Sequence, residues 1–373
     1  MRRFKDTTSR HRPDITLLVC LGLLTIIGLF ALTSAGAAVG YQKFGDSYFF
    51  IKHQILYGLL PGLVLFAIFF SVNYQFWKKF TLPFLALSIL LLITVFIPGL
   101  GAKFGTARSW IDLGGFSLQP SEIVKLTFML YLATWLAKRG EHGVKDLYYG
   151  FMPFLFLIGI ISVLMLLQPD TGSLAIIIFM SVAVFFASGA KAKHVLGLFA
   201  AGAFGFYLLL KSSTYRAARF QTFLHPELDL QGRGYHINQA FMAIGSGGFW
   251  GRGFGNSQQK FNYLPEPTGD SIFAIMSEEL GFVLCFLIVS LFVMILWRSF
   301  KIAKNVNDPF GRLLAIGISS WFIFQAFFNI SSMIGLLPMT GVPLPFISYG
   351  GTALAMNLAG AGILLNISRQ TKI

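Results

Sequence analysis

One polar segment decides how this chain is interpreted, Asn262-Tyr263-Leu264-Pro265-Glu266-Pro267-Thr268-Gly269-Asp270, because nearly everything around it is apolar. It closes a polar interval that runs from about Lys211 to Asp270 and contains four of the fifteen acidic residues of the chain. The segment leads directly into an apolar helix that carries Glu278 and Glu279. We therefore expect the apolar segments to form a membrane scaffold and the 211–270 loop to carry the chemistry.

The composition is that of a membrane protein. The 373 residues are 55% hydrophobic and only 12% charged, with a mean hydropathy of +0.70, whereas a soluble domain carries about 25% charged residues. Cys20 and Cys285 both lie in apolar segments, so they predict neither a disulfide framework nor a metal site. The net charge of +14 is interpreted as a record of membrane topology, and nucleic acid is not expected as a partner.

Ten segments are candidate membrane spans, since a spanning helix needs about 20 mostly apolar residues. We expect an all-α polytopic protein with a single transmembrane domain over residues 1–373. The predicted spans are 15–38, 54–72, 80–98, 122–137, 151–168, 172–189, 194–210, 271–297, 312–335 and 349–367. An even number of spans places both termini on the same side of the membrane.

The short segments between the spans predict the orientation, because cytoplasmic loops carry an excess of Lys and Arg. If the basic tail 1–14 is cytoplasmic, the inside segments carry 18 Lys and Arg, against 4 in the short outside segments. Both termini are therefore expected in the cytoplasm. The 211–270 loop, between the seventh and eighth spans, is expected on the outer face with the 99–121 and 336–348 loops.

The 336–348 loop contains Pro338, Pro343 and Pro345 and no charged residue. Proline fixes φ and lacks a backbone donor, which disfavours a regular helix. Apolar backbone without helical hydrogen bonds must be buried in protein or line a cavity at a membrane boundary. We expect this loop to fold back against the bundle and to wall an outer cavity.

Ionisable residues within or beside the predicted spans are candidates for function, because charge is costly in a membrane. Glu122 and Lys125 are three residues apart on one helix face, so they either neutralise each other or present a cation to the cavity. Asp170, in an outer turn, is placed to cap the following helix, and this is the simpler interpretation.

The start of the eighth span holds three carboxylates. Asp270 lies where the helix begins, and the helix dipole favours a carboxylate there. Glu278 and Glu279 lie deeper in the helix and need partners, which we expect to be Lys or Arg from another helix. The preceding interval holds basic residues that either form a solvated face or attract an anionic headgroup, since Arg matches phosphate oxygens. They are Arg216, Arg219, Arg233, Arg252 and Lys260.

Other motifs carry no clear signal. Gly251-Arg252-Gly253-Phe254-Gly255 is not a dinucleotide-binding motif and has no βαβ context. No GxSxG motif is present, and no Ser/His/Asp order can be defended. The histidines show no ligand spacing; they are His11, His53, His142, His194, His225 and His236. The residues alone therefore indicate an outer site for a phosphorylated amphiphile and leave enzyme and transporter as alternatives.

Several motifs along nearly the whole chain match those of a known family. They are Arg108-Ser109-Trp110-Ile111, Gln119-Pro120-Ser121-Glu122 with Lys125, Gln168-Pro169-Asp170-Thr171-Gly172, Gly234-Tyr235 with Gln239, Leu264-Pro265-Glu266, Asp270, Glu278-Glu279-Leu280-Gly281, and the run from Gly341 to Gly351. The chain thereby resembles the SEDS family (shape, elongation, division and sporulation), the membrane peptidoglycan glycosyltransferases typified by FtsW and RodA. It departs from the family at Thr268-Gly269, where His-Thr is usual. Phe223-Leu224-His225-Pro226 and the ending Leu364 to Arg369 resemble the division branch more than the elongation branch.

The resemblance implies polymerisation of lipid II into glycan strands on the outer face of the bacterial cytoplasmic (inner) membrane, for septal synthesis in division. It implies Asp270 as a general base in a single displacement that inverts the anomeric carbon. We expect Arg216, Arg219 and Lys260 to bind the leaving pyrophosphate, with a divalent Mg or Mn cation as a further candidate. The other predicted substrate-binding residues are Glu266, Gln239, Ser348, Lys125, Glu122 and Arg108.

Three alternatives remain at this point. The chain could be an elongation-type polymerase, a lipid II flippase with access from both faces, or an inactive scaffold that recruits a transpeptidase. The resemblance implies a class B penicillin-binding protein as partner, docked on the helices after the large loop, and other membrane proteins of the division or elongation machinery.

Overall fold

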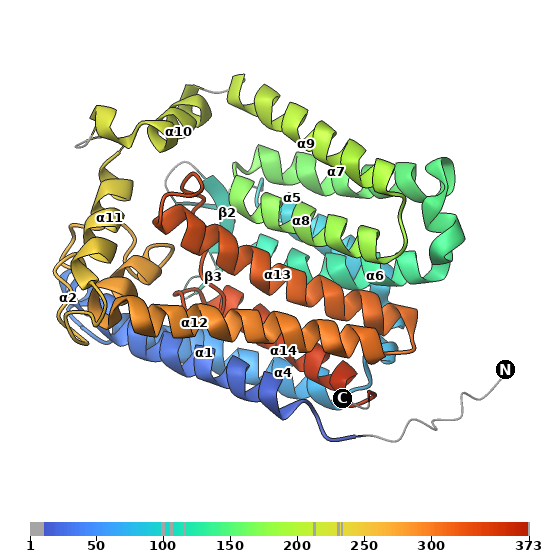
Figure 1. Cartoon of the computed structure of the whole chain (residues 1–373), viewed down its shortest axis with the longest axis horizontal. Coiled ribbons are helices and arrows are strands. Elements are labelled where there is room, and N and C mark those ends of the chain that lie inside the picture. Colours follow the sequence, from blue (N-terminus) through green and yellow to red (C-terminus); the bar gives the residue numbers. More distant parts are fainter. Residues whose placement is uncertain are drawn as a thin grey trace.

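The chain forms a bundle of long helices with smaller elements gathered at one end (Figure 1). The computed structural model describes residues 11–97, 101–104, 107–112, 114, 116–211, 214–229, 232 and 234–371. Its α-helices are α1 (Ile15–Ala35), α2 (Ala37–Phe44), α3 (Phe49–Gln54), α4 (Leu60–Ser71), α5 (Thr81–Thr94), α6 (Pro120–Lys145), α7 (Met152–Leu167), α8 (Thr171–Ala187), α9 (Ala192–Lys211), α10 (Thr214–Leu224), α11 (Tyr235–Gly247), α12 (Ile272–Asn305), α13 (Pro309–Met333) and α14 (Gly351–Ser368). Short π-helices η1 (Ile55–Leu59) and η3 (Leu147–Phe151) and 3₁₀-helices η2 (Tyr74–Phe80) and η4 (Pro226–Asp229) extend or connect them.

Each of the ten predicted spans coincides with a helix, so the expected fold class is confirmed. Seven helical segments of the described chain are long and apolar enough to cross a membrane, and α8 and α9 contribute shorter apolar helices. The fourth predicted span, 122–137, lies in α6, which has 26 residues and carries Glu122 and Lys125. The structure is therefore that of a polytopic membrane protein.

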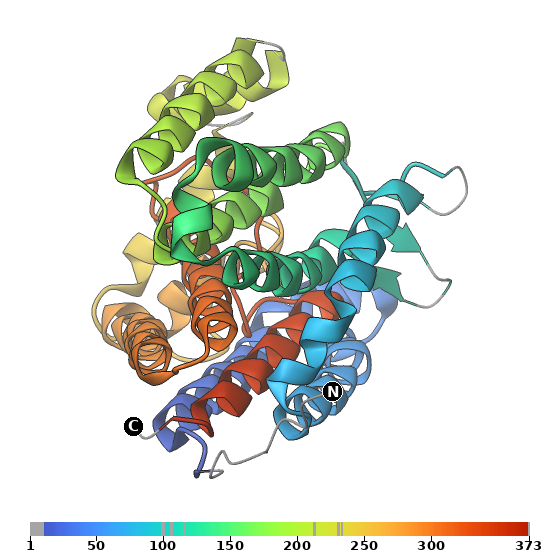
Figure 2. The same cartoon turned by 90° about the vertical axis from the view of Figure 1, so that its right-hand side faces the viewer.

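The last two helices form the centre of the bundle. Within their most apolar 18 residues, 67% of α13 and 83% of α14 are buried, against 28% in α12 and 17% in the segment Tyr74–Thr94. α14 packs against α4, and α13 packs against α6, α8 and α12 (Figure 2). The outer helices consequently turn large apolar side chains outward, as lipid-facing helices do.

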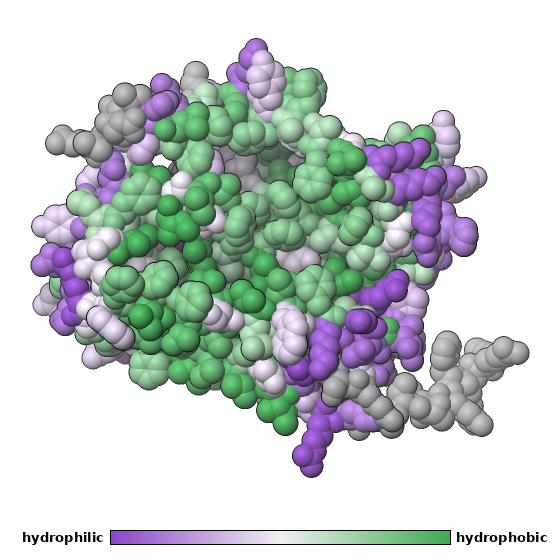
Figure 3. Space-filling view, in the orientation of Figure 1, coloured by the Kyte–Doolittle hydropathy of each residue, from purple (hydrophilic) through white to green (hydrophobic). Residues whose placement is uncertain are grey.

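The surface has the polarity of a membrane-spanning bundle. Figure 3 shows a hydrophobic band across the middle and hydrophilic residues at both ends of the long helices. At one end Ser368 Oγ accepts a hydrogen bond from the Asp14 backbone N–H at 3.0 Å, and Arg298 pairs with Asp14 at 2.6 Å. The two described chain ends thus meet at one end of the bundle, as an even number of spans requires.

Aspartates begin several helices in the way the sequence suggests. Asp14, Asp170 and Asp308 each accept a backbone N–H from the first turn of α1, α8 and α13, respectively. This confirms the capping interpretation of Asp170. Asp170 also accepts a hydrogen bond from Ser121 Oγ at 3.0 Å, so the same carboxylate ties α8 to the start of α6.

The predicted outer end of the bundle contains more regular structure than expected. The 99–121 loop, predicted only as a connection, forms an antiparallel sheet of β1 (Gly101–Phe104), β2 (Ala107–Asp112) and β3 (Ser117–Leu118) in the order β1-β2-β3. Ile111 pairs with Gly101 on one side and with Leu118 on the other. The 211–270 interval is not a loop throughout, because α10, η4 and α11 lie within it.

The proline-containing loop folds back into the protein, as predicted. Residues 336–348 form no regular helix, and Val342, Leu344, Phe346 and Ile347 are each at most 3% exposed. Gln325 Nε2 of α13 donates a hydrogen bond to the Pro343 carbonyl at 2.9 Å. Side chains of the central helix thus satisfy backbone groups that a helix would otherwise pair internally.

Candidate active site

Asp270 lies at the end of the bundle where α12 begins, and three parts of the chain meet there. Asn329 Nδ2, on α13, donates hydrogen bonds to the carbonyls of Asp270 at 2.7 Å and Val342 at 2.8 Å. The Tyr349 backbone N–H donates to the Thr268 carbonyl at 2.8 Å. The segment that ends in Asp270 is therefore fastened, through its backbone, to α13 and to the proline-containing loop.

The carboxylate of Asp270 is half-buried beside the N-terminus of α12. Asp270 precedes Ser271, the N-cap residue of α12, so it lies one residue before the position expected for a cap. Ser271 Oγ donates to Asp270 Oδ1 over 3.4 Å, and a Cβ at Gly341 would lie 4.0 Å from Oδ2. The helix dipole favours a negative charge at this position. The carboxylate thus lies between the helix start and the proline-containing loop.

Glu278 and Glu279 organise the segment between α11 and Asp270. Glu278 accepts hydrogen bonds from the backbone N–H groups of Gln258 (3.1 Å) and Gln259 (3.3 Å), and it pairs with Arg252 at 3.2 Å. Glu279 accepts the Ser257 N–H at 3.2 Å. The expectation that cations from another helix neutralise these acids is therefore wrong, because their cationic partners come from the preceding segment.

Lys260 is the partner of Glu279. Its Nζ lies 3.0 Å from Glu279, 2.9 Å from Ser34 Oγ of α1 and 2.5 Å from the Gly255 carbonyl. Ser34 itself donates to Glu279 at 2.6 Å. The residue is 5% exposed. In this arrangement the ammonium ion holds the loop to α1 and α12, so the geometry supports a positioning role instead of the predicted contact with pyrophosphate.

Glu122 and Lys125 neutralise each other, which was one of the two interpretations of their spacing; the other was a cation presented to the cavity. The pair measures 2.7 Å, and both side chains are fully buried. Lys125 Nζ also donates to Gln325 Oε1 at 2.6 Å, and Trp321 Nε1 donates to the same oxygen at 2.8 Å. The pair links α6 to the helix that anchors the proline-containing loop, and a direct contact with substrate stays a prediction.

The other predicted site residues are placed differently. Ser348 Oγ accepts the Leu344 N–H at 2.7 Å and so stabilises a buried turn. Gln239 lies on α11, and its Oε1 is buried without a hydrogen-bond partner in the described structure. Glu266 is exposed and has a positive φ of 48°. Arg216 and Arg219 lie on α10 and Arg108 on β2, but their side chains and all of Arg233 lie outside the described part.

Two residues that sequence reasoning did not select belong to this site. Asn329 lies in α13, and an amide inside an apolar helix is a signal in itself, because it needs partners in a membrane. His236 of α11 was set aside for lack of ligand spacing. Its Nε2 lies 2.7 Å from Ser271 Oγ, a contact that no linear pattern reveals.

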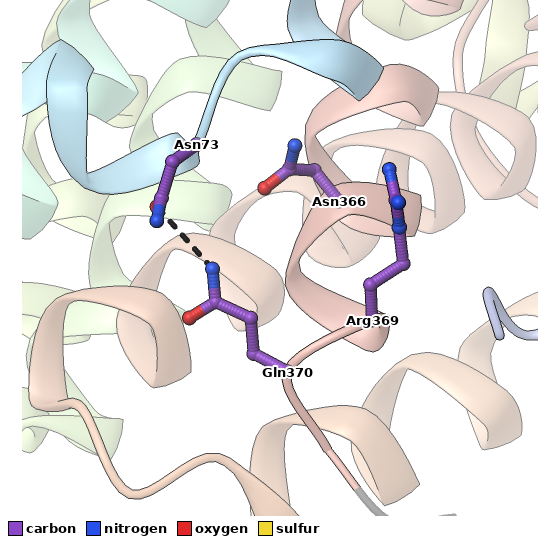
Figure 4. A pocket seen from close by; sticks show the side chains of 4 residues that line it. All are labelled: Asn73, Asn366, Arg369 and Gln370. Atoms are coloured by element: carbon purple, nitrogen blue, oxygen red, sulfur yellow. Dashed lines mark hydrogen bonds between the residues drawn. The ribbon is translucent and has the colours of Figure 1, made fainter. Parts of the chain in front are cut away.

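A small pocket lies at the opposite end of the bundle from Asp270. It is lined by Asn73, Asn366, Arg369 and Gln370, and Gln370 Nε2 donates to Asn73 Oδ1 at 3.2 Å (Figure 4). Arg369 follows α14 at the end where the termini meet, which separates this pocket from the outer elements (Figure 1). It is therefore no part of the candidate active site.

Comparison with known proteins places the chain in a family. A family model described as "Cell cycle protein", for FtsW, RodA and SpoVE, matches residues 14–373. The chain belongs to this family. The SEDS resemblance found in the motifs is therefore confirmed.

Relatives in this family match the chain over almost its full length. It is 39% identical over 368 residues to stage V sporulation protein E of Bacillus subtilis (strain 168), covering 98% of this chain and 100% of that protein. It is 36% identical over 359 residues to a probable peptidoglycan glycosyltransferase FtsW of Geobacter sp. (strain M18), covering 96% and 97%.

Solved structures of two proteins have the same fold as this chain. A chain from a peptidoglycan synthase complex, solved to show how polymerization and crosslinking are coordinated, superposes with a TM-score of 0.80 at 26% identity and covers 96% of this chain and 98% of that one. The rod shape determining protein RodA of Thermus thermophilus superposes with a TM-score of 0.70 at 27% identity, over 96% and 97%. The helical arrangement is thus that of the RodA-like family members.

Proposed function

We propose that this protein is a peptidoglycan glycosyltransferase that polymerises lipid II at the outer face of the bacterial inner membrane, with both termini in the cytoplasm. The observation that carries the proposal is the place of Asp270, a half-buried carboxylate held at the outer end by Asn329 and the proline-containing loop. The names of the FtsW relatives and of the peptidoglycan synthase complex support the reaction class. The motifs near the C-terminus and after α10 favour the division branch.

In the proposed mechanism Asp270 takes the proton of the acceptor sugar hydroxyl as that oxygen attacks the anomeric carbon of the donor. A positioned base contributes about 10²–10⁴-fold to such a step. The attack expels undecaprenyl pyrophosphate in a single inverting displacement. Charge then develops on the pyrophosphate, and preplaced cations stabilise it. Arg216 and Arg219 of α10 are the proposed cations, since Lys260 is engaged with Glu279.

A divalent cation remains a proposal that the residues allow. Among the described residues, no group of three His, Cys, Asp or Glu side chains is placed to hold a metal ion. Mg²⁺ commonly binds through one or two carboxylates and completes its shell with water and substrate phosphates. Glu266, exposed in the catalytic segment, is the oxygen donor that would hold such an ion beside the substrate, where the ion would neutralise charge on the pyrophosphate.

The proposed partner is a class B penicillin-binding protein whose membrane helix packs on α12. The complex that superposes on this chain is a peptidoglycan synthase. In the described structure α12 exposes apolar side chains along its outer length, including Phe282, Phe286 and Trp297, each more than half exposed. An apolar helix face of this kind suits either lipid or a partner helix in the membrane.

The test is lipid II polymerisation by the purified protein, with and without its cognate transpeptidase, comparing wild type with Asp270→Asn. We expect glycan strands from wild type and none from the variant, while lipid II binding and thermal stability persist. Asp46→Asn is the matched control, because it removes a different carboxylate at the same end of the bundle. Lys52 hydrogen-bonds the Asp46 carboxylate and lowers its pKa, so Asp46 is charged at the assay pH.

Two outcomes would contradict the proposal. Full activity of Asp270→Asn would remove the base from the mechanism. Absence of strands under every partner condition, together with movement of lipid II across proteoliposome membranes, would favour the flippase.

A further inference from the structure

A chain of hydrogen bonds leads from Asp270 to an imidazole on a different helix. Ser271 Oγ lies 3.4 Å from Asp270 Oδ1 and 2.7 Å from His236 Nε2. Ser271 is completely buried, whereas Asp270 and His236 are both partly exposed. A buried hydroxyl therefore bridges a carboxylate and a histidine whose ring retains access to the outside.

A serine hydroxyl has one proton and can donate to only one of these two neighbours at a time. When it donates to the Asp270 carboxylate, His236 Nε2–H must donate to the serine oxygen. When Asp270 is protonated, the carboxyl O–H can donate to the serine, and the serine can donate to an unprotonated Nε2. Both arrangements use the same atoms, so the contact geometry serves the ionised and the protonated state of Asp270.

We propose that Ser271 and His236 form a proton relay that returns Asp270 to its ionised state after each transfer. The inference rests on the proposed function, because it needs Asp270 as the base. In the sugar transfer the acceptor O–H bond breaks as the new C–O bond forms, the proton goes to Asp270, and pyrophosphate leaves with the electron pair of the broken bond. Asp270 then passes its proton to Ser271 Oγ while the serine proton moves to His236 Nε2, and the imidazolium loses its other ring proton to water. Exchange of the remaining ring proton from Nε2 to Nδ1 through water restores the Nε2 lone pair before the next transfer.

The elements around His236 determine which charges it faces. α11 packs against α12, α13 and η4. On the α12 side the carboxylate next to the relay is Asp270, while Glu278 and Glu279 are held by Arg252 and Lys260. η4 contributes Asp229, whose Oδ1 accepts the Gly232 N–H at 2.8 Å, and Glu227, whose side chain lies outside the described part. α13 carries one charged residue, Arg312, in its first turn at the other end of the bundle.

A purely structural alternative exists, because the same contact also fastens α11 to the start of α12. The two interpretations differ in how activity depends on pH. An imidazole must be unprotonated to accept the serine proton, and free imidazoles titrate near pH 6.5, above carboxylates. A relay therefore makes kcat fall when acidification protonates the imidazole of His236, whereas an anchor adds no ionisation to kcat.

The experiment measures kcat and KM for lipid II as a function of pH in wild type, His236→Gln, Ser271→Ala and the control His142→Gln, an exposed histidine at the other end of the bundle. Glutamine keeps a hydrogen-bonding group without the ionisation. We expect kcat of His236→Gln and Ser271→Ala to be about two- to tenfold lower, the value of one hydrogen bond, with unchanged KM. In His236→Gln the acid limb should move to the lower pH at which carboxylates titrate.

The outcomes separate this inference from the proposed function. If Asp270→Asn is inactive while His236→Gln has the wild-type pH profile and kcat, the relay is wrong and the base assignment stands. If His236→Gln changes only KM or the melting temperature, the contact is an anchor and the relay is likewise wrong. If Asp270→Asn is active, the proposed base fails, and the relay fails with it.

Discussion

At the scale of single residues, the buried pair of Lys260 and Glu279 makes a testable claim about what holds the outer segment. Removing one member of a buried pair strands the other charge and costs about 3–5 kcal/mol. We expect Lys260→Met to lower the stability of the purified protein by this order, because Glu279 is only 3% exposed. Thermal unfolding in detergent measures the loss.

The double variant Lys260→Met/Glu279→Gln is the matched control for that pair. It removes both charges, so we expect it to recover a large part of the stability lost in Lys260→Met. If Lys260→Met is as stable as wild type, the pair of Lys260 and Glu279 does not hold the outer segment. A single variant that is stable but fails to bind lipid II would restore the original prediction that Lys260 contacts the pyrophosphate.

Asn329 is a second residue whose role is positional. Its amide pairs with the carbonyls of Asp270 and Val342, and an unsatisfied buried polar group costs about 1–3 kcal/mol. In Asn329→Ala both carbonyls lose this donor, so the Asp270 segment should separate from the proline-containing loop. We expect kcat for polymerisation to fall at least tenfold, while Asn305→Ala, an exposed amide at the end of α12, should behave as wild type. Equal kcat values in the two variants would show that the hydrogen bonds of the Asn329 amide do not position Asp270.

At the scale of elements, α12 is two helices joined at Gly281. This residue has φ 73° and ψ −180°, and a Cβ there would lie 2.2 Å from Gly251 N and 2.6 Å from the Trp250 carbonyl carbon. Both neighbours are backbone atoms, so side-chain movement cannot relieve the clash. The break lets the segment after α11 lie directly on α12, where Gly253 N–H donates to the Glu279 carbonyl.

Gly281→Ala should therefore displace that segment. A side chain in this backbone conformation costs about 1–3 kcal/mol before the clash is counted. We expect a clear fall in melting temperature and a loss of polymerisation activity. Gly202→Ala is the control, since a Cβ at this position in α9 meets nothing within 4 Å and alanine favours helices. An unchanged melting temperature in Gly281→Ala would show that the contact between Gly251 and Gly281 is not fixed.

The elements also show what the sequence can predict. Apolar runs located all ten spanning helices, because hydropathy decides whether a segment enters a membrane. The start of α8 after Asp170 followed from local capping chemistry. The sheet around β2 was missed because its strands are only two to six residues long and lie in a segment interpreted as a connection. The break at Gly281 was missed because the surrounding residues read as one continuous apolar helix.

In the candidate site, too, some residues could be predicted from the sequence and their contacts could not. Asp270, Glu278 and Glu279 could be selected because charge beside or within an apolar helix is costly and therefore informative. Their partners could not be predicted, since Ser34 meets Lys260 across more than two hundred residues of sequence and His236 meets Ser271 from another helix. Such contacts depend on tertiary packing, which a linear pattern does not contain.

At the scale of the whole molecule, the proposed function depends on which end of the bundle faces outward. Asp270 directly precedes the N-cap of α12, and α12 begins at the end that carries α2 and α11, whereas the described chain ends lie at the other end (Figure 1). The excess of Lys and Arg predicts that the end with the termini faces the cytoplasm. Lipid II polymerisation at the outer face requires this orientation, because glycan strands form outside the membrane.

Cysteine labelling tests the orientation directly. Lys43→Cys at the end of α2 and His142→Cys near the end of α6 place exposed thiols at opposite ends, while the native Cys20 and Cys285 are buried and give little background. In intact cells with a permeable outer layer, a membrane-impermeant maleimide should label Lys43→Cys only, and His142→Cys should become reactive after the inner membrane is opened. The reverse pattern would place Asp270 in the cytoplasm, where a base for glycan polymerisation has no acceptor strand, and it would overturn the proposed function even if Asp270→Asn were inactive.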